Sequence, residues 1–376
     1  MEKKSVISTG QLLCIMIMPR VAFSTAYFSA LNAGRHIQAV LITSPIIFLL
    51  NFLVAVPMLL LLRHHPGKSF LECVSQVAGK AGTVVLALVY LFFFLLQGVG
   101  TLGNFQLFYL NGVIPDSKLY AIAIPLLIVC VYGAVRGIET IGRFSGIALF
   151  IYCVIVLLII LSLLGIMNTD YLFPLLFHDR GYIGQALLFR YNSNTQLLIL
   201  ASCTQFLKPG VKPGRVYARW NIIAALMVFV IELVCVLVMG PFASKQIFPI
   251  YTLSEITQLG VFERMDAFHM VAWIMESVLT VTVYLYLALD ALSKIGVRRF
   301  RVLSASLFAA MTAFFAYFVT TNNQQYLAYL GSALYACIVS ALLFAIPLLI
   351  LLVDIIKERV RGDESRQGNP VDRETA

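Results

Sequence analysis

Long apolar runs constrain this chain more than any other feature of its sequence. Stretches of about 20 apolar residues, the length that spans a bilayer as a helix, recur along almost all of its 376 residues. Only 12% of the residues are charged and 60% are hydrophobic, whereas soluble domains carry about 25% charged residues. The sequence therefore predicts an all-α polytopic membrane protein, with no segment that resembles a soluble catalytic domain.

The uninterrupted apolar segments predict ten membrane-spanning helices joined by short loops. We expect one transmembrane domain over residues 1–353, built from two repeats at about 11–166 and 184–353. A disordered cytoplasmic tail is expected over residues 354–376, which are polar and charged. The ten predicted spans are 11–32, 38–62, 82–106, 119–134, 143–166, 184–206, 218–240, 266–291, 301–320 and 328–353.

Lysine and arginine are distributed unequally between the two sides of these spans. Of the 27 basic residues, 20 lie in the amino terminus, the alternate loops that follow it on the same side, and the tail, whereas five lie on the other side. Because basic loops stay in the cytoplasm, both termini are predicted to be cytoplasmic. This asymmetry accounts for the net charge of +9 and gives no reason to expect a nucleic-acid partner.

The sequence offers no pattern typical of an enzyme, a cofactor site or a metal site. The seven cysteines form no CxxC pair, and the five histidines are scattered. The segment "GVGTLG" (98–103) matches a dinucleotide-binding pattern but lies inside an apolar helix, where small residues let helices approach closely. We therefore predict no enzymatic activity, no cofactor and no bound metal.

Two predicted spans are interrupted in corresponding places. Span 6, "LLFRYNSNTQLLIL" (187–200), carries six polar residues from Arg190 to Gln196, and span 1, "CIMIMPRVAFSTAYF" (14–28), carries Pro19 beside Arg20. Spans 1 and 6 are the first members of two five-span halves. Broken helices at matching positions of two halves are typical of a transporter-type site near the bilayer midplane, between inverted repeats.

A purely structural interpretation stays open for these breaks. Prolines and small polar residues are common in membrane helices, and Asn or Ser can simply bridge neighbouring helices. An arginine in the middle of a span, however, costs at least ~2.5 kcal/mol on insertion scales. One arginine at each break, Arg20 and Arg190, favours a polar cavity between the two halves.

Two acidic residues, Glu232 in span 7 and Glu276 in span 8, are also predicted to lie within the membrane. Two buried cations and two buried anions suggest pairing, although the sequence leaves the partners open. Glu276 is a candidate either for a structural ion pair or for a proton carrier. Glu232 is a candidate for a structural ion pair, or for a neutral, protonated carboxyl.

Polar stripes on two further spans complete the predicted cavity. Span 3 carries Tyr90, Gln97, Gly100, Thr101 and Asn104, and span 8 carries a second stripe at helical spacing, namely His269, Trp273, Glu276, Thr280 and Tyr284. The predicted ligand-binding residues are Arg20, Ala22, Gln97, Thr101, Arg190, Asn192, Asn194, Glu276 and Thr280.

The segment between spans 7 and 8, "PFASKQIFPIYTLSEITQLGVFERMDAFHMVAWIM" (241–275), predicts a short amphipathic helix. Thr252 and Glu255 have the spacing of a capping box, and Gly260 is a plausible stop. The segment resembles the same region of the bacterial spore germination permeases, the B subunits of germinant receptors. The matching residues are Pro249, Glu255, Gly260, Glu263, Arg264, Asp266 and Trp273. The amino-terminal "ISTGQLL" (7–13), the ten-span layout and the length are also similar.

This resemblance implies the five-plus-five inverted-repeat fold of the amino acid–polyamine–organocation superfamily, with broken helices 1 and 6. It implies a small germinant, often an amino acid, as ligand, and a location in the spore inner membrane of a bacterium. It also implies membrane A subunits and lipoprotein C subunits as partners. One departure is that "PRVAF" (19–23) lacks the glycines that usually hold the substrate carboxylate, so Arg20 or Arg190 is expected to take that role.

Three functions remain open on the sequence. A receptor would pass a ligand-driven shift between two states to its partner subunits. A permease would move an amino acid or similar solute together with a proton, with Glu276 as the candidate carrier. A conduction subunit would provide an ion or water path without a ligand of its own.

Overall fold

The computed structural model describes residues 6–26, 37–115, 117–173, 180–257, 265–297 and 299–367. Within these ranges the secondary structure is helical, apart from one isolated bridge between Ile7 and Leu207. The α-helices are α1 (Thr9–Ala26), α2 (Ala39–His64), α3 (Phe70–Val77), α4 (Gly79–Gly112), α5 (Leu119–Arg136), α6 (Ile138–Leu163), α7 (Arg180–Asn192), α8 (Gln196–Cys203), α9 (Pro213–Met239), α10 (Pro249–Glu255), α11 (Asp266–Lys294), α12 (Arg301–Thr321), α13 (Asn323–Leu330), α14 (Ala333–Ser340) and α15 (Ile346–Gln367).

Eight segments in the described part of the chain are long and apolar enough to cross a membrane. They coincide with eight of the ten spans that the sequence predicts. The other two predicted spans correspond to α1, which is apolar but shorter, and to the pair α7 and α8. The last of the eight segments combines α14, a π-helical stretch at Ala341–Ala345 and most of α15.

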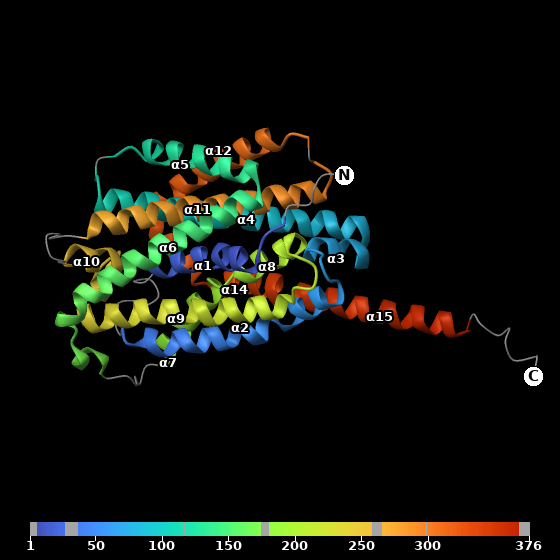
Figure 1. Cartoon of the computed structure of the whole chain (residues 1–376), viewed down its shortest axis with the longest axis horizontal. Helices are drawn as coiled ribbons and strands as arrows, with labels where there is room; N and C mark the ends of the chain where they lie inside the picture. Colours follow the sequence, from blue (N-terminus) through green and yellow to red (C-terminus); the bar gives the residue numbers. More distant parts are fainter. Residues whose placement is uncertain are drawn as a thin grey trace, which may run out of the picture.

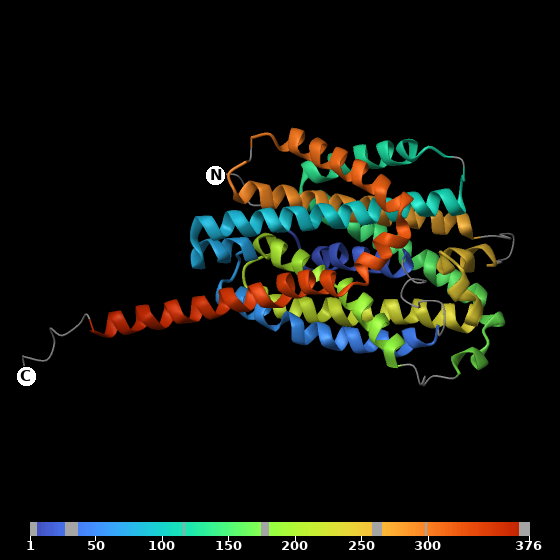
Figure 2. The ribbon, with the colours of Figure 1, turned by 180° about the vertical axis from the view of Figure 1, so that it is seen from behind.

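The helices pack around α11, which is the most enclosed of the long segments. Inside the bundle, 78% of its most apolar stretch is buried, against 28% for α6. Figures 1 and 2 show α5 and α12 along one side of the bundle, α2 and α9 along the other, and α1 and α8 between them. Helices α1 and α8 therefore lie in the middle of the protein (Figures 1 and 2), where neighbouring helices can satisfy an irregular backbone.

The small residues of "GVGTLG" serve helix packing, as the sequence predicts. A Cβ atom added to Gly103 would lie 2.6 Å from a methyl carbon of Val319 on α12, which is closer than real contacts allow. One added to Gly98 would lie 3.8 Å from Thr312 on the same helix. Gly103 therefore allows α4 and α12 to approach closely, whereas 3.8 Å at Gly98 is an ordinary van der Waals distance.

The predicted break in the first span is wrong, because α1 continues through Pro19 as one helix from Thr9 to Ala26. Proline removes one backbone hydrogen bond, to the carbonyl of Ile15, but the flanking side chains from Ile15 to Val21 are all buried. Packing against neighbouring helices on this scale outweighs the loss of a single bond. The helix therefore passes the proline without stopping.

Two further boundaries differ from the sequence prediction. The short helix α10 begins at Pro249, not at a Thr252 cap, and the Thr252 hydroxyl instead donates to the carbonyl of Phe248 at 3.4 Å. Proline suits the first helical position because its missing N–H would be unpaired there. Residues 258–264, including Gly260, lie outside the described residues. Helix α11 begins at Asp266, as predicted.

Helix α15 continues to Gln367, whereas the sequence predicts a disordered tail from Asp354 onward. Contacts with other helices hold the start of this extension: Asp354 lies 2.9 Å from His65, and the Lys357 ammonium donates to the carbonyl of Val77 at 2.6 Å. Both views show α15 projecting beyond the bundle (Figures 1 and 2). Residues 368–376 lie outside the described part of the tail.

Candidate ligand-binding site

The second predicted break is confirmed: α7 ends at Asn192 and α8 begins at Gln196. The Ser193 hydroxyl and the Asn194 amide both donate to the carbonyl of Arg190, at 2.6 and 2.8 Å. Short polar side chains compete in this way with the backbone bonds of a helix. The polar run in span 6 therefore ends one helix and starts another in the interior of the protein.

A cavity of about 40 Å³ lies beside this break. That volume holds roughly three water molecules, at 10–15 Å³ each. Residues from α1, the break, α4, α11, α13 and α14 line it. They are Pro19, Ala22, Phe23, Gln97, Gly100, Thr101, Asn104, Asn192, Ser193, Thr195, Gln196, Trp273, Ser277, Thr280, Tyr284, Tyr326, Leu330 and Tyr335.

Gln97 of α4 connects the walls of the cavity. Its amide nitrogen donates to the Thr195 hydroxyl at 3.0 Å, and its carbonyl oxygen accepts from the Tyr335 hydroxyl at 2.9 Å. One side chain thus connects α4 to the start of α8 and to the start of α14 by hydrogen bonds. A wall fixed by hydrogen bonds presents its remaining polar atoms in defined positions.

Three lining residues carry buried polar atoms that have no hydrogen-bond partner among the described residues. They are the Asn192 carbonyl oxygen, the Gln196 carbonyl oxygen and the Thr280 hydroxyl. The Asn192 side chain is itself held in place, because its amide donates to the carbonyl of Leu330 at 2.6 Å. A buried polar atom without a partner costs about 1–3 kcal/mol. A bound molecule that donates hydrogen bonds would remove this cost.

The two buried arginines lie just behind the cavity. Arg190 pairs with Glu232 of α9 at 2.8 Å, and both side chains are fully buried. Arg20 donates to the Ser193 hydroxyl at 2.7 Å, and its guanidinium carbon lies 5.1 Å from the ring centre of Phe48. Arg20 also interacts electrostatically with both members of the ion pair. The structure thus assigns Glu232 to Arg190 and leaves an excess of positive charge beside the break.

Five of the nine predicted ligand-binding residues line the cavity: Ala22, Gln97, Thr101, Asn192 and Thr280. The other four lie elsewhere. Arg20 and Arg190 lie behind Ser193, and Asn194 caps α7. Glu276 is buried on α11 beside the cavity-lining stripe, and its Oε1 atom has no hydrogen-bond partner in the described part of the chain. Tyr152 of α6 lies within electrostatic range of Glu276.

Sequence reasoning missed the lining residues from the end of the chain, Tyr326, Leu330 and Tyr335, as well as Phe23 of α1. A signal was present in "NNQQYLAYLGSALY" (322–335), a polar and tyrosine-rich stretch at the start of the last predicted span. It resembles the polar run of span 6 in composition. This stretch forms α13 and the start of α14, which meet close to the cavity.

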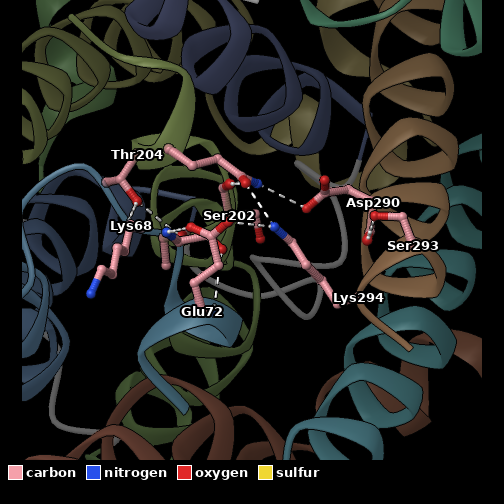
Figure 3. A network of polar contacts seen from close by, with 10 residues as sticks. Lys68, Glu72, Ser202, Thr204, Asp290, Ser293 and Lys294 are labelled. Carbon is pink, nitrogen blue, oxygen red and sulfur yellow. Dashed lines mark hydrogen bonds and ion pairs between the residues drawn. The ribbon is translucent and has the colours of Figure 1, made fainter. Parts of the chain in front are cut away.

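A second polar network joins α3, α11 and the short 3-10 helix Thr204–Phe206 that follows α8 (Figure 3). The Lys294 ammonium donates to Glu72 at 2.9 Å and to the Gln205 carbonyl oxygen at 2.7 Å. The Gln205 amide in turn donates to Asp290 at 3.1 Å. The Thr204 hydroxyl donates to the carbonyl of Lys68 at 2.7 Å. This network ties the end of α8 farthest from the break to α3 and α11.

Comparisons with known proteins agree with this architecture. A solved nucleobase-cation-symport-1 family transporter, in a closed conformation with bromovinylhydantoin bound, is 15% identical with a TM-score of 0.56. The match covers 89% of this chain and 78% of that one. A Na+-coupled sialic acid symporter, in a substrate-bound outward-open state, is 11% identical with a TM-score of 0.61, over 86% of this chain and 75% of that one. These similarities show a shared transporter fold.

The comparison with curated proteins found no match to the chain. A family model described as "Spore germination protein" matches residues 6–326, which is most of the sequence. The resemblance that the sequence suggests is thereby confirmed, and the chain belongs to the spore germination permease family.

Proposed function

We propose that this chain is the B subunit of a germinant receptor and binds a small germinant in the cavity beside the α7–α8 break. The observation that carries the proposal is the set of unpartnered, buried polar atoms on Asn192, Gln196 and Thr280. Membership of the spore germination family supports a role in germination. The proposed setting is the spore inner membrane, with both termini cytoplasmic and with A-type and C-type subunits as partners.

The chemistry of the cavity favours a small amino acid. The two amide carbonyl oxygens and the hydroxyl can accept hydrogen bonds from an ammonium group. The backbone N–H groups of Gln196 and Leu197 lie at the positive end of the α8 dipole, which favours an anion, whereas the N–H of Leu198 donates to the carbonyl of Thr195. The positive charge of Arg20, which donates a hydrogen bond to the cavity-lining Ser193, also favours an anion at this end of the cavity. An ammonium group near the side-chain oxygens of Asn192, Gln196 and Thr280, and a carboxylate at the first backbone N–H groups of α8, would use both.

Binding would act by shifting an equilibrium between two states of the protein. The ligand would join the start of α8 to α11, and it can shift the equilibrium only by its difference in affinity for the two arrangements. Gln97 links the same region to α14. A ligand-driven movement of the break would therefore reach the last helices of the chain.

The test is amino acid binding to the purified chain in lipid nanodiscs, with Thr280→Val as the site variant. We expect at least one small amino acid to raise the unfolding temperature in a saturable manner, and Thr280→Val to weaken its affinity about tenfold, the equivalent of one hydrogen bond of ~1.4 kcal/mol. Thr312→Val is the matched control, because Thr312 is equally buried but donates to the carbonyl of Phe308 on its own helix. Equal binding by both variants would contradict the proposal.

Proton-coupled uptake of an amino acid is the second candidate function, favoured by the buried and incompletely partnered carboxyl of Glu276 beside the cavity. A permease must also open the end of the bundle that the Glu72–Lys294 network holds together. Proteoliposomes with an imposed pH gradient separate the two functions. Concentrative uptake that Glu276→Gln abolishes would establish the permease, whereas binding without uptake supports the receptor.

A further inference from the structure

A cluster of potential metal ligands lies outside the cavity, where the end of α2 meets α15. His64 is the last residue of α2, and Asp354 and Glu358 lie on α15. One ligand atom from each of these three side chains lies within 4.8 Å of the other two. Asp354 is largely buried, with 9% of its side chain exposed, whereas His64 and Glu358 reach the surface.

The local structure explains how residues so distant in sequence come together. Asp354 and Glu358 are four residues apart on one helix and therefore point from the same face. Helix α2 ends at His64, and His65 leaves the helical conformation with φ −118° and ψ 72°. Gly67 then completes the turn with a φ of 75°. Because of this turn, the neighbouring rings of His64 and His65 both reach the same carboxylate.

The distances suit a small divalent ion. Ligands at 2.0–2.2 Å from a tetrahedral Zn²⁺ lie about 3.4 Å from one another. The His64 Nδ1 atom lies 3.8 Å from an Asp354 oxygen. The His65 Nε2 atom lies 2.9 Å from that same oxygen, which is the distance of a hydrogen bond. His65 can therefore orient the carboxylate as an outer partner while His64 ligates the ion.

The donor set selects the class of metal. One imidazole and two carboxylates suit zinc and similar first-row transition metals better than magnesium or calcium, which prefer oxygen ligands alone. The group whose ligand atoms lie within 4.8 Å of one another consists of His64, Asp354 and Glu358, so the set is one of nitrogen and oxygen atoms.

We propose that His64, Asp354 and Glu358 bind a divalent transition metal of the zinc class and that the ion fastens α15 to the end of α2. The sequence does not predict this site, because His64 lies almost 300 residues from Asp354 and Glu358 and the three follow no known metal-binding motif. The site is separate from the cavity and does not depend on the identity of the germinant. It would hold α15 in place together with the bond from Lys357 to Val77.

The test is Zn²⁺ binding to the purified full chain, without an affinity tag that contains histidine, measured by calorimetry after treatment with EDTA. We expect one saturable site per chain. His64→Ala and Glu358→Gln should each weaken affinity by more than about 100-fold, and His65→Ala by about 10–100-fold, the range typical of outer partners. Because Glu358 is exposed, Glu358→Gln should fold normally, which size-exclusion chromatography checks.

Two further variants test whether Glu358 is a ligand of the metal. Glu139→Gln removes an exposed carboxylate far along the chain and should leave Zn²⁺ affinity unchanged. Glu358→His supplies a second imidazole and should restore or increase Zn²⁺ affinity relative to Glu358→Gln. The site is refuted if the wild-type chain shows no saturable binding, or if Glu358→Gln and Glu139→Gln bind Zn²⁺ equally.

Discussion

Helix α1 and the pair α7–α8 look alike in sequence but differ in structure. Each carries an arginine in mid-membrane sequence, and α1 alone carries a proline beside it. Yet α1 is continuous through Pro19, whereas the proline-free segment breaks after Asn192. The proline removes only one backbone hydrogen bond from α1. In the other segment, side chains donate to the carbonyl of Arg190 and replace the backbone bonds that would continue the helix.

The two arginines also differ in the partners of their guanidinium groups. Arg190 has a carboxylate partner, Glu232, with both charges fully buried. Arg20 has a neutral hydroxyl, that of Ser193, and the aromatic ring of Phe48 beside it instead of a carboxylate. Arg190 is therefore bound into the structure, whereas Arg20 retains charge that can act on the cavity through Ser193.

The largest effect should come from Arg190→Ala. It leaves Glu232 buried without its partner, which typically costs about 3–5 kcal/mol. Detergent extraction followed by size-exclusion chromatography should show a severe loss of folded protein. The double variant Arg190→Met with Glu232→Leu removes both charges and should recover most of it. A single variant that accumulates like the wild type would contradict this cost.

Arg20→Met should have a smaller effect on folding and a clear effect on binding. It removes a hydrogen bond from a charged group, worth about 1.5–3 kcal/mol, but leaves no buried anion unpaired. Thermal unfolding and amino acid binding measure the two consequences. A loss of stability greater than that of Arg190→Ala would reverse the contrast drawn between the two arginines.

Gln97→Leu should come next, with a loss of about 1–2 kcal/mol. The substitution removes two hydrogen bonds and leaves the Tyr335 hydroxyl without its partner, whereas Thr195 keeps its interaction with Tyr284. Chemical or thermal unfolding in a fixed lipid measures the change. Adding Tyr335→Phe to Gln97→Leu should cost little more, because the hydroxyl is then no longer stranded. Fully additive losses would show that the two residues do not interact.

Pro19→Ala should have the smallest effect, and its sign is the informative part. Alanine restores an N–H group for the Ile15 carbonyl in a helix that is already continuous, so we expect a gain of up to about 1 kcal/mol after the lost ring contacts are counted. The unfolding temperature should rise slightly. A marked fall would indicate that the protein depends on a break at Pro19 after all.

Properties encoded locally could be predicted from the sequence. Hydropathy located the long spans, and the run of short polar side chains located the break before Gln196. The helical spacing of Gln97 and Thr101 on α4, and of Trp273 and Thr280 on α11, placed each pair on one face of its helix, and all four line the cavity. In each case the signal lies within one continuous segment of the chain.

Features that depend on packing between distant segments could not be predicted. The continuity of α1 rests on its burial among other helices. The choice of Arg190 rather than Arg20 as the partner of Glu232 depends on how α7 and α9 are rotated. Tyr326 and Tyr335 reach the cavity because α14 packs against α7 and α13 packs against α14, and this packing joins distant parts of the chain.

The end of α15 that projects beyond the bundle (Figure 1) would amplify any tilt at its base. Its base is fastened near Asp354 and Lys357, and the ten residues beyond Lys357 to Gln367 span about 15 Å at 1.5 Å per residue. A tilt of about 10° at the base would displace its tip by about 2.6 Å on that length. A rotation too slight to rearrange side chains within the bundle would thus become a movement large enough for another protein to sense.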